Sequence, residues 1–155
     1  MAETRPSDSG TPKAPALALA ATLLLLAGCG SGDDGGTAAT TRQAATVRVS
    51  ERDFRISLSP RRVRAGRIRL VVRNKGPVNH ELILVKVAGR GLPLRGDGLT
   101  VDEDRLERRT AGVIEPMTPA TSDELRVALT RGRYVLLCNM AGHYLSGMRA
   151  ELVVQ

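Results

Sequence analysis

Apolar and polar residues alternate in short runs along the C-terminal two-thirds of the chain. The clearest run is Arg67–Arg73, in which an aliphatic residue stands at every second position among arginines. A side-chain period of two predicts a β-strand with one buried face. The same alternation predicts further strands at Thr46–Ser50, Phe54–Leu58, Leu125–Leu129, Tyr134–Leu137 and Met148–Val154. The pattern therefore predicts an all-β domain.

One apolar run, Val78–Val87, is nearly continuous after His80 instead of alternating. Such a run is typical of a strand that is covered on both faces or lies close to the core between two sheets. In the last strand, alternation means that a Met148 pointing inward carries Leu152 and Val154 into the core with it.

Between Ala88 and Ser122 the chain is rich in glycine, proline and charged residues, and only one helix is predicted there. Thr100 and Glu103 form the Thr-x-x-Glu pattern of a capping box, which predicts a short helix over Val101–Arg108. We interpret the segment as an accessory loop. Its acidic residues lack the spacing of a Ca²⁺ loop, which favours a solvated helix face over a hard-metal site; they are Asp97, Asp102, Glu103 and Asp104.

The first 28 residues are organised like a bacterial export signal. A polar start with Arg5 and Lys13 leads into an apolar run shorter than the roughly 20 residues of a spanning helix. The run ends in Leu26-Ala27-Gly28-Cys29, which resembles the lipobox of bacterial lipoproteins. This resemblance implies that Cys29 is acylated, becomes the first residue of the mature chain and anchors it to a membrane. The alternative is an ordinary signal peptide, or an uncleaved anchor that contains a cysteine.

After Cys29 the chain is dense in glycine and small polar residues and has no apolar periodicity, which predicts a flexible tether. We therefore divide the chain into a signal peptide (1–28), a tether (29–45) and a folded domain (46–155). Aromatic residues make up 2% of the chain and tryptophan is absent, so the core of that domain must be aliphatic.

The chain is basic, with a formal net charge of +7. A basic surface beside a membrane favours anionic lipid headgroups or an acidic redox partner. Nucleic acid is another common partner of basic chains, but the export signal and the shortage of aromatic residues for base stacking argue against it. We expect a monomer that faces the periplasm or the cell exterior.

Cys138, His143 and Met148 follow one another as Cys-x4-His-x4-Met between two apolar runs. A thiolate, an imidazole and a thioether form a set of soft ligands that selects copper. The chain has two histidines, and the second one, His80, completes a set of two His, one Cys and one weak axial Met. If Cys29 is acylated, Cys138 has no disulfide partner, and a bound metal is the simplest occupant of its thiol. A buried inert cysteine is the alternative, and the spacing disfavours it.

This ligand set and its surroundings resemble the cupredoxins, in particular the sulfocyanin-like domains of bacteria. The similar segments are Asn79–Leu82 and Gly132–Tyr144. The resemblance implies a Greek-key β-sandwich that carries single electrons between redox partner proteins and holds one type 1 (blue) copper ion through His80, Cys138, His143 and Met148. Plastocyanin and azurin place an asparagine after the first histidine, where it ties the ligand loops together. Here Glu81 follows His80, and the asparagine precedes it.

Other functions of the same residues are weaker interpretations. A copper carrier for delivery, storage or resistance would use the same ligands, whereas a metal-free structural domain is disfavoured because all four ligands are present. An enzyme is disfavoured because four filled positions leave none for a substrate, and the chain has no further histidines for an oxygen-reducing centre. Met140 is a competing thioether, but it is better explained as apolar cover, and Met148 is predicted to be the axial ligand.

Overall fold

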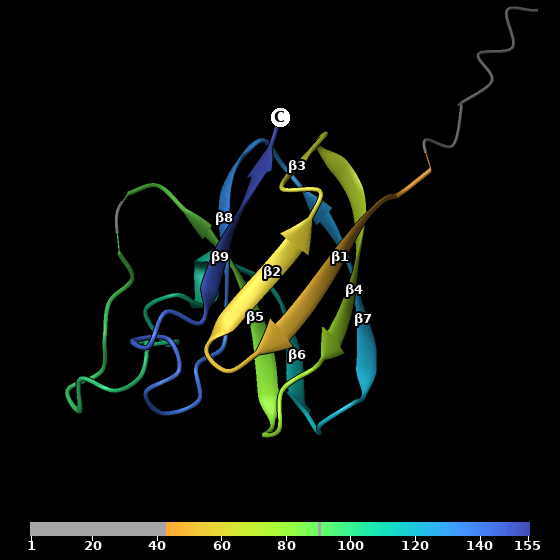
Figure 1. Cartoon of the computed structure of the whole chain (residues 1–155). Helices are drawn as coiled ribbons and strands as arrows, with labels where there is room; N and C mark the ends of the chain where they lie inside the picture. Colours follow the sequence, from red (N-terminus) through yellow and green to blue (C-terminus); the bar gives the residue numbers. More distant parts are fainter. Residues whose placement is uncertain (1–42, 90) are drawn as a thin grey trace, which may run out of the picture. The chain divides into compact units, whose positions relative to one another are not determined.

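The alternating runs pair into two facing sheets in a computed structural model of the chain (Figure 1). The structure describes residues 43–89 and 91–155. The predicted signal peptide (1–28), Cys29 and all of the predicted tether (29–45) except its last three residues lie outside the described residues. The first strand begins at Ala45, next to the predicted start of the folded domain. The described ranges contain no helix that is long and apolar enough to cross a membrane.

The first sheet has four strands in the order β2-β1-β4-β7. β1 and β4 run parallel, and the other two pairs are antiparallel. All four strands overlap predicted ones, and β7, at the edge of the sheet, begins three residues before its predicted start. Their bounds are β1 (Ala45–Arg52), β2 (Arg55–Ser59), β4 (Gly66–Asn74) and β7 (Ser122–Leu129).

The second sheet has five strands in the order β3-β9-β8-β5-β6. β8 is antiparallel to both β5 and β9, whereas the short β3 runs parallel to β9. The two sheets confirm the predicted β-sandwich. The bounds are β3 (Arg62–Val63), β5 (His80–Val87), β6 (Thr110–Met117), β8 (Gly132–Leu137) and β9 (Arg149–Val154).

The core between the sheets is mainly aliphatic, as the composition predicts. In β4, the alternate residues Ile68, Leu70 and Val72 are buried, and Arg67, Arg69 and Arg73 lie on the opposite face. Leu152 and Val154 are buried in the same cluster as Met148, which confirms the alternation predicted for the last strand.

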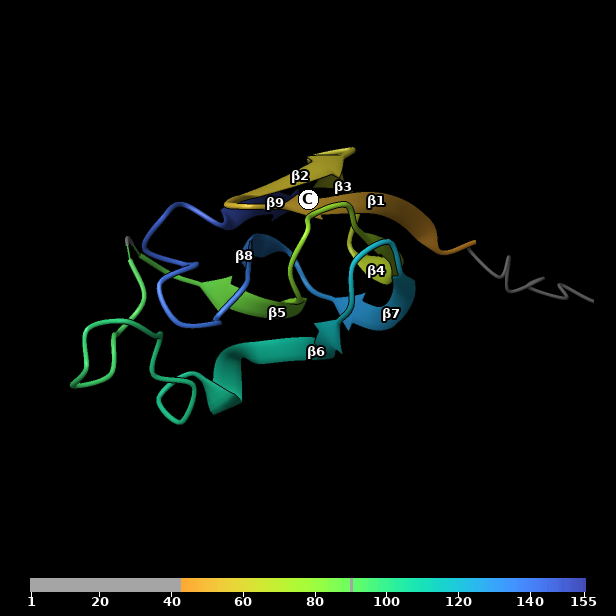
Figure 2. The same ribbon diagram turned by 60° about the horizontal axis from the view of Figure 1, so that its bottom comes forward.

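A second apolar cluster covers the other face of β5. Ile83 and Val85 are buried there, and Val101 and Leu106 from the β5–β6 connection pack against them together with Tyr144. Figure 2 shows this connection extending well beyond the strands. β5 is therefore covered on both faces, which confirms the interpretation of its continuous apolar run.

The helix predicted over Val101–Arg108 is wrong. Val101 instead forms an isolated β-bridge with Leu94, and the only helical turn among the described residues is the 3-10 helix η1 (Glu107–Arg109). The side chain of Asn139 holds Val101 in this extended form, because its oxygen accepts a hydrogen bond from the Val101 N–H and its nitrogen donates one to the Val101 carbonyl. A long-range contact thus overrides the local capping pattern.

β6 is a strand that the sequence pattern does not predict. Gly112 and Pro116 interrupt its alternation, but β6 is the edge strand of its sheet, where proline is tolerated. A Cβ atom on Gly112 would lie 2.9 Å from a methyl group of Leu125 in the opposite sheet. The glycine is therefore needed for the close approach of β6 and β7.

Candidate metal centre

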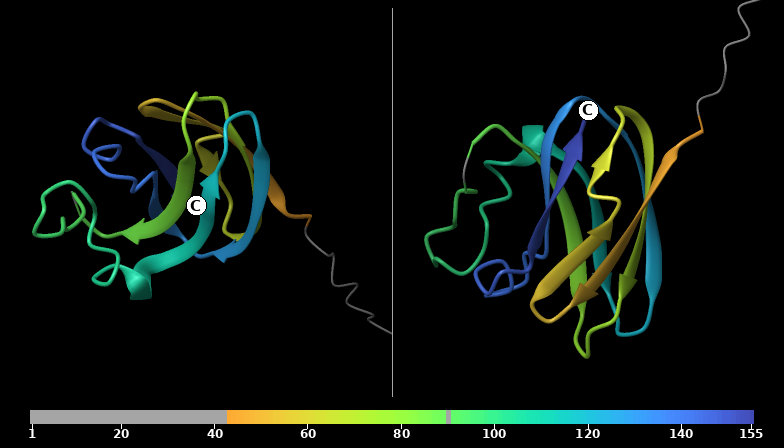
Figure 3. Two further views of the ribbon diagram at one scale, coloured as in Figure 1. Left: turned by 90° about the horizontal axis from the view of Figure 1, so that it is seen from below. Right: turned by 45° about the horizontal axis from the view of Figure 1, so that its top comes forward.

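The ends of three neighbouring strands bring the predicted ligands together. His80 begins β5, Cys138 directly follows β8, and Met148 directly precedes β9. Because β8 is antiparallel to both of its neighbours, the end of β8 lies beside the beginnings of β5 and β9. His143 lies on the connection from β8 to β9, which Figure 3 (left) shows at the end of the sandwich that carries the β1–β2 turn.

Three of the ligand atoms lie close together. Sγ of Cys138 is 3.3 Å from Nδ1 of His143 and 4.0 Å from Nδ1 of His80. All three atoms lie within 4.8 Å of one another. His80 and Cys138 are fully buried, whereas His143 is partly exposed. This arrangement can surround one metal ion while leaving one ligand at the surface.

Backbone hydrogen bonds fix the loop that carries Met148. The Cys138 N–H donates to the Met148 carbonyl at 3.2 Å, and the Met148 N–H donates to the His143 carbonyl at 3.0 Å. Met148 is fully buried in the same core cluster as Cys138. Met140 is only partly buried, and its carbonyl accepts the His143 N–H at 2.9 Å, so its backbone helps to form the turn.

The protonation of the ligands follows from their burial. Burial raises the pKa of the Cys138 thiol to about 11, although the backbone N–H groups of Glu81 and Met140 act in the opposite direction. Burial also lowers the pKa of His143, and the neighbouring His80 lowers it further. His143 is therefore neutral at neutral pH, which is the form that binds metals, and a metal cation would take the place of the thiol proton.

Asp53, in the turn between β1 and β2, contacts the far side of the His80 ring. Its Oδ1 lies 2.7 Å from Nε2 of His80, and neither atom has a hydrogen-bond partner elsewhere among the described residues. A carboxylate at Nε2 favours the tautomer whose Nδ1 is free to bind a metal. Gly76 makes room for this pair, because a Cβ atom there would lie 2.6 Å from Nε2 and 2.8 Å from Oδ1.

Glu81 connects the two ligand segments. Its carboxylate accepts a hydrogen bond of 3.0 Å from the backbone N–H of Asn139, which follows Cys138. A glutamate thus ties the ligand loops together at the position where plastocyanin and azurin place an asparagine. Burial raises the pKa of Glu81, and the nearby Glu103 raises it further.

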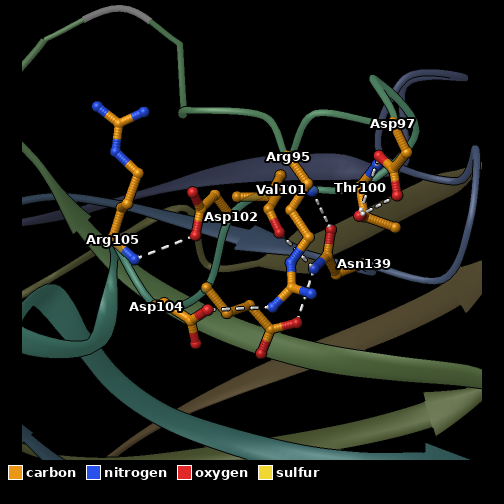
Figure 4. A network of polar contacts seen from close by, with 9 residues as sticks. Arg95, Asp97, Thr100, Val101, Asp102, Asp104, Arg105 and Asn139 are labelled. Atoms are coloured by element: carbon orange, nitrogen blue, oxygen red, sulfur yellow. Dashed lines mark hydrogen bonds and ion pairs between the residues drawn. The ribbon is translucent and has the colours of Figure 1, made fainter.

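Asn139 also attaches the accessory loop to the site. Figure 4 shows its side chain bonded to both backbone groups of Val101, and its nitrogen also donates to Glu103 at 2.7 Å. Asp97 and Asp102 serve the loop's own turns, since they accept the N–H groups of Leu99 and Arg105. Among the described residues, the only group of His, Cys, Asp and Glu spaced to hold a metal is His80, Cys138 and His143.

Asn74 holds the loop that precedes His80. Its side-chain nitrogen donates to the carbonyls of Val78 and Met117, and its oxygen accepts the Gly76 N–H. Sequence reasoning found the ligands but missed this residue, as well as Asp53. An asparagine at the end of a strand before a Gly-Pro turn is a local signal that could have indicated Asn74, whereas the contact of Asp53 has no local signal.

Glu51 is a buried carboxyl group near the site. It is fully buried, and neither of its oxygens has a hydrogen-bond partner among the described residues. Burial raises its pKa to about 8, and the charge of Glu81 adds to the increase. Glu51 is therefore mainly protonated at neutral pH.

The surface beside His143 is apolar. The ring of Phe54 meets the ring of His143 edge to face, with 5.1 Å between the ring centroids. Phe54 and Leu145 are 46% and 47% exposed, so they form an apolar rim beside the one partly exposed ligand.

Comparisons with known proteins identify the fold. Neither the protein-family models nor the curated proteins give a match. Among solved structures, the chain is similar to reduced auracyanin from Roseiflexus castenholzii (TM-score 0.53, 20% identity, covering 72% of this chain and 98% of that one). It is also similar to auracyanin A, a blue copper protein from Chloroflexus aurantiacus (0.52, 19%, 73% and 100%), and to rusticyanin from Thiobacillus ferrooxidans (0.53, 12%, 73% and 79%).

The chain thus has the β-sandwich fold of the cupredoxins. At the end of that sandwich, His80, Cys138, His143 and Met148 form the ligand set of a type 1 copper site. Sequence identity to these three structures is between 12% and 20%, so they show the fold alone. The function is therefore inferred from the residues of the site.

Proposed function

We propose that this protein is a blue copper protein that carries single electrons between redox partners at a membrane. The observation that carries the proposal is that ligand atoms of His80, Cys138 and His143 lie within 4.8 Å of one another. Met148 lies on the loop that carries His143, and its N–H donates a hydrogen bond to the His143 carbonyl. Two imidazoles, a thiolate and a weak axial thioether are the ligands of an electron-transfer copper site, not of an open catalytic one. With no position left for a substrate, we propose that the protein is not an enzyme.

The chain supplies a rigid and dry frame for this site. When bound, copper supplies a centre that takes up and releases one electron. Asp53 orients His80 from outside, Glu81 joins the ligand segments, and three of the four ligand side chains are fully buried. Ligands held in place by strand ends change little between oxidation states, which favours fast electron transfer. His143 and its apolar rim provide the route to a partner.

The test uses residues 43–155, which contain the nine strands and both core clusters of the described part of the chain. This fragment with Cu(II) is expected to be intensely blue, because the colour arises from charge transfer between a cysteine sulfur and Cu(II). The electron paramagnetic resonance spectrum checks the site geometry. Cys138→Ser is expected to abolish the colour, and a variant that stays blue would refute the assignment.

A copper carrier for delivery, storage or resistance is the alternative, since it could use the same ligands. The two functions differ in whether the reduced protein keeps its metal. An electron carrier is expected to pass through repeated oxidation and reduction without losing copper to a Cu(I) chelator. Copper that leaves within a few cycles, or moves readily to a copper-free acceptor, would favour the carrier.

We also propose that the domain is anchored to a membrane through acylated Cys29 and faces the periplasm or the cell exterior as a monomer. The support is the lipobox-like ending Leu26-Ala27-Gly28-Cys29 and the glycine-rich stretch after it. The redox partner is proposed to be acidic because the chain is basic. In that case the rate of electron transfer is expected to fall as ionic strength rises.

A further inference from the structure

We propose that the outer face of the sheet β2-β1-β4-β7 is a docking surface for anionic phospholipid headgroups. This inference deepens the proposed function, because it specifies how the copper domain meets the membrane. It rests on residues that take no part in the metal centre.

The strand register gathers positive charge on this face. Residues opposite one another in paired strands share a face, so the outward positions of the four strands follow from their buried neighbours. Seven of these outward residues are arginines and one is acidic. The arginines are Arg48, Arg52, Arg55, Arg67, Arg69, Arg73 and Arg126.

The one acidic side chain on this face leaves most of the charge unpaired. Glu124 is bonded to Arg69 and Arg126. The other five arginines form no ion pair among the described residues. A formal net charge of +7 for the whole chain is thus concentrated largely on one face.

A groove of about 410 Å³ lies on this face and is lined by residues of all four strands. Its lining contains basic, hydroxyl and apolar side chains: Arg48, Arg73 and Lys75, the serines Ser50, Ser57, Ser59 and Ser122, and Val49, Leu58 and Val71. Guanidinium groups and hydroxyls are the groups that bind phosphate oxygens. No described segment lies over this face in Figure 1, whereas Val101 and Leu106 of the accessory loop pack on the outer face of the other sheet.

The chemistry of the face favours lipid over protein or single-stranded nucleic acid. Apart from arginine, its outward residues are mainly serine and threonine, with Val71 and Ala128 as the only apolar ones. Protein interfaces have a core of apolar and aromatic side chains, and single-stranded nucleic acid needs aromatic stacking; this face has neither. A flat anionic membrane needs only clustered basic residues. The copper ligands lie at one end of the sandwich, so docking by this face leaves His143 open to a partner.

The test is the binding of the copper-loaded fragment 43–155 to vesicles. This fragment lacks Cys29, so the lipid anchor cannot contribute. We expect it to bind vesicles made of equal parts of phosphatidylglycerol and phosphatidylcholine, and not to bind vesicles of phosphatidylcholine alone. Added salt is expected to release it from the anionic vesicles. Arg48→Glu combined with Arg73→Glu is expected to weaken binding at least about tenfold. The matched control, Arg105→Glu with Arg108→Glu, changes two exposed arginines of the accessory loop and is expected to change binding less than about twofold.

Blue colour in every variant shows that the domain is folded. The proposal is overturned if the fragment does not bind the anionic vesicles, or if the control pair weakens binding as much as the first pair. It is also overturned if the fragment binds soluble polyglutamate but not vesicles, because the face would then serve an acidic protein. A fragment that binds vesicles but takes up no copper would contradict the electron-transfer function and leave the docking surface intact.

Discussion

The carboxylate of Glu81 accepts a hydrogen bond from the backbone N–H of Asn139. The residue after the first histidine is thereby joined to the residue after the cysteine, across 58 positions of sequence. The backbone N–H of Glu81 also points to the Cys138 sulfur, so one residue contacts the second ligand segment through both its backbone and its side chain.

Glu81→Ala is expected to lower the free energy of unfolding of the copper-free fragment. The reason is that the buried Asn139 N–H loses its acceptor, which costs about 1–3 kcal/mol. Glu81→Gln keeps an oxygen at that place and is expected to lose less than half as much. Chemical denaturation of both variants measures the difference, and equal losses would show that the hydrogen bond is not the cause.

Asp53→Ala is expected to lower the affinity for Cu(II) by roughly 10- to 100-fold, because His80 loses the group that orients its ring. Asp53→Asn retains an oxygen and is expected to lose less affinity, while its missing charge raises the reduction potential. Competition with a chelator and voltammetry measure the two effects. Asp104→Asn, an exposed change in the accessory loop, is the control. Unchanged affinity in Asp53→Ala would contradict the orienting role.

Met148→Leu is expected to keep the blue colour and to shift the reduction potential, because the axial bond is weak and the thiolate bond is intact. Met140→Leu is the matched control and is expected to leave the potential nearly unchanged. If the control shifts the potential and Met148→Leu does not, the axial ligand has been assigned to the wrong methionine.

Glu51→Gln is expected to stabilise the copper-free fragment increasingly as pH rises. Between the ordinary pKa of 4.5 and the folded-state pKa of about 8, Glu51 is ionised in the unfolded chain but protonated in the folded one. The wild-type folded state therefore loses stability with rising pH, at up to about 1.4 kcal/mol per pH unit, and the glutamine variant does not. Denaturation of both proteins between pH 5 and pH 8 tests this. Curves that stay parallel would mean that Glu51 is already ionised in the folded state.

The full-length protein is expected to fractionate with membranes and to partition into detergent, whereas Cys29→Ala is expected to block lipidation and processing by the lipoprotein route. Mass spectrometry of the mature N-terminus is the measurement. A water-soluble wild-type protein that begins at a residue other than Cys29 would argue against the anchor.

The ligands were predictable because three of them are close in sequence and His80 is the only other histidine. The strands were predictable where each buried residue alternates with a polar one. β6 was not, since Gly112 fills an inward position without a side chain. The helix prediction failed because Asn139, far along the chain, binds Val101. Asp53 illustrates the general reason: residues that support a site from a distant turn leave no pattern in their own neighbourhood.

The connection that carries three ligands is bounded by a fixed pair, since Leu137 and Arg149 face each other in adjacent antiparallel strands. Whatever lies between them has to begin and end at the same two points. The length of this segment can therefore vary at residues 145–147, whereas Asn139, His143 and Tyr144 are needed for the accessory loop, the metal and the second apolar cluster. Three of the four metal ligands thus belong to one hairpin, and its length can be redesigned without moving His80 in β5 or Asp53 in the β1–β2 turn.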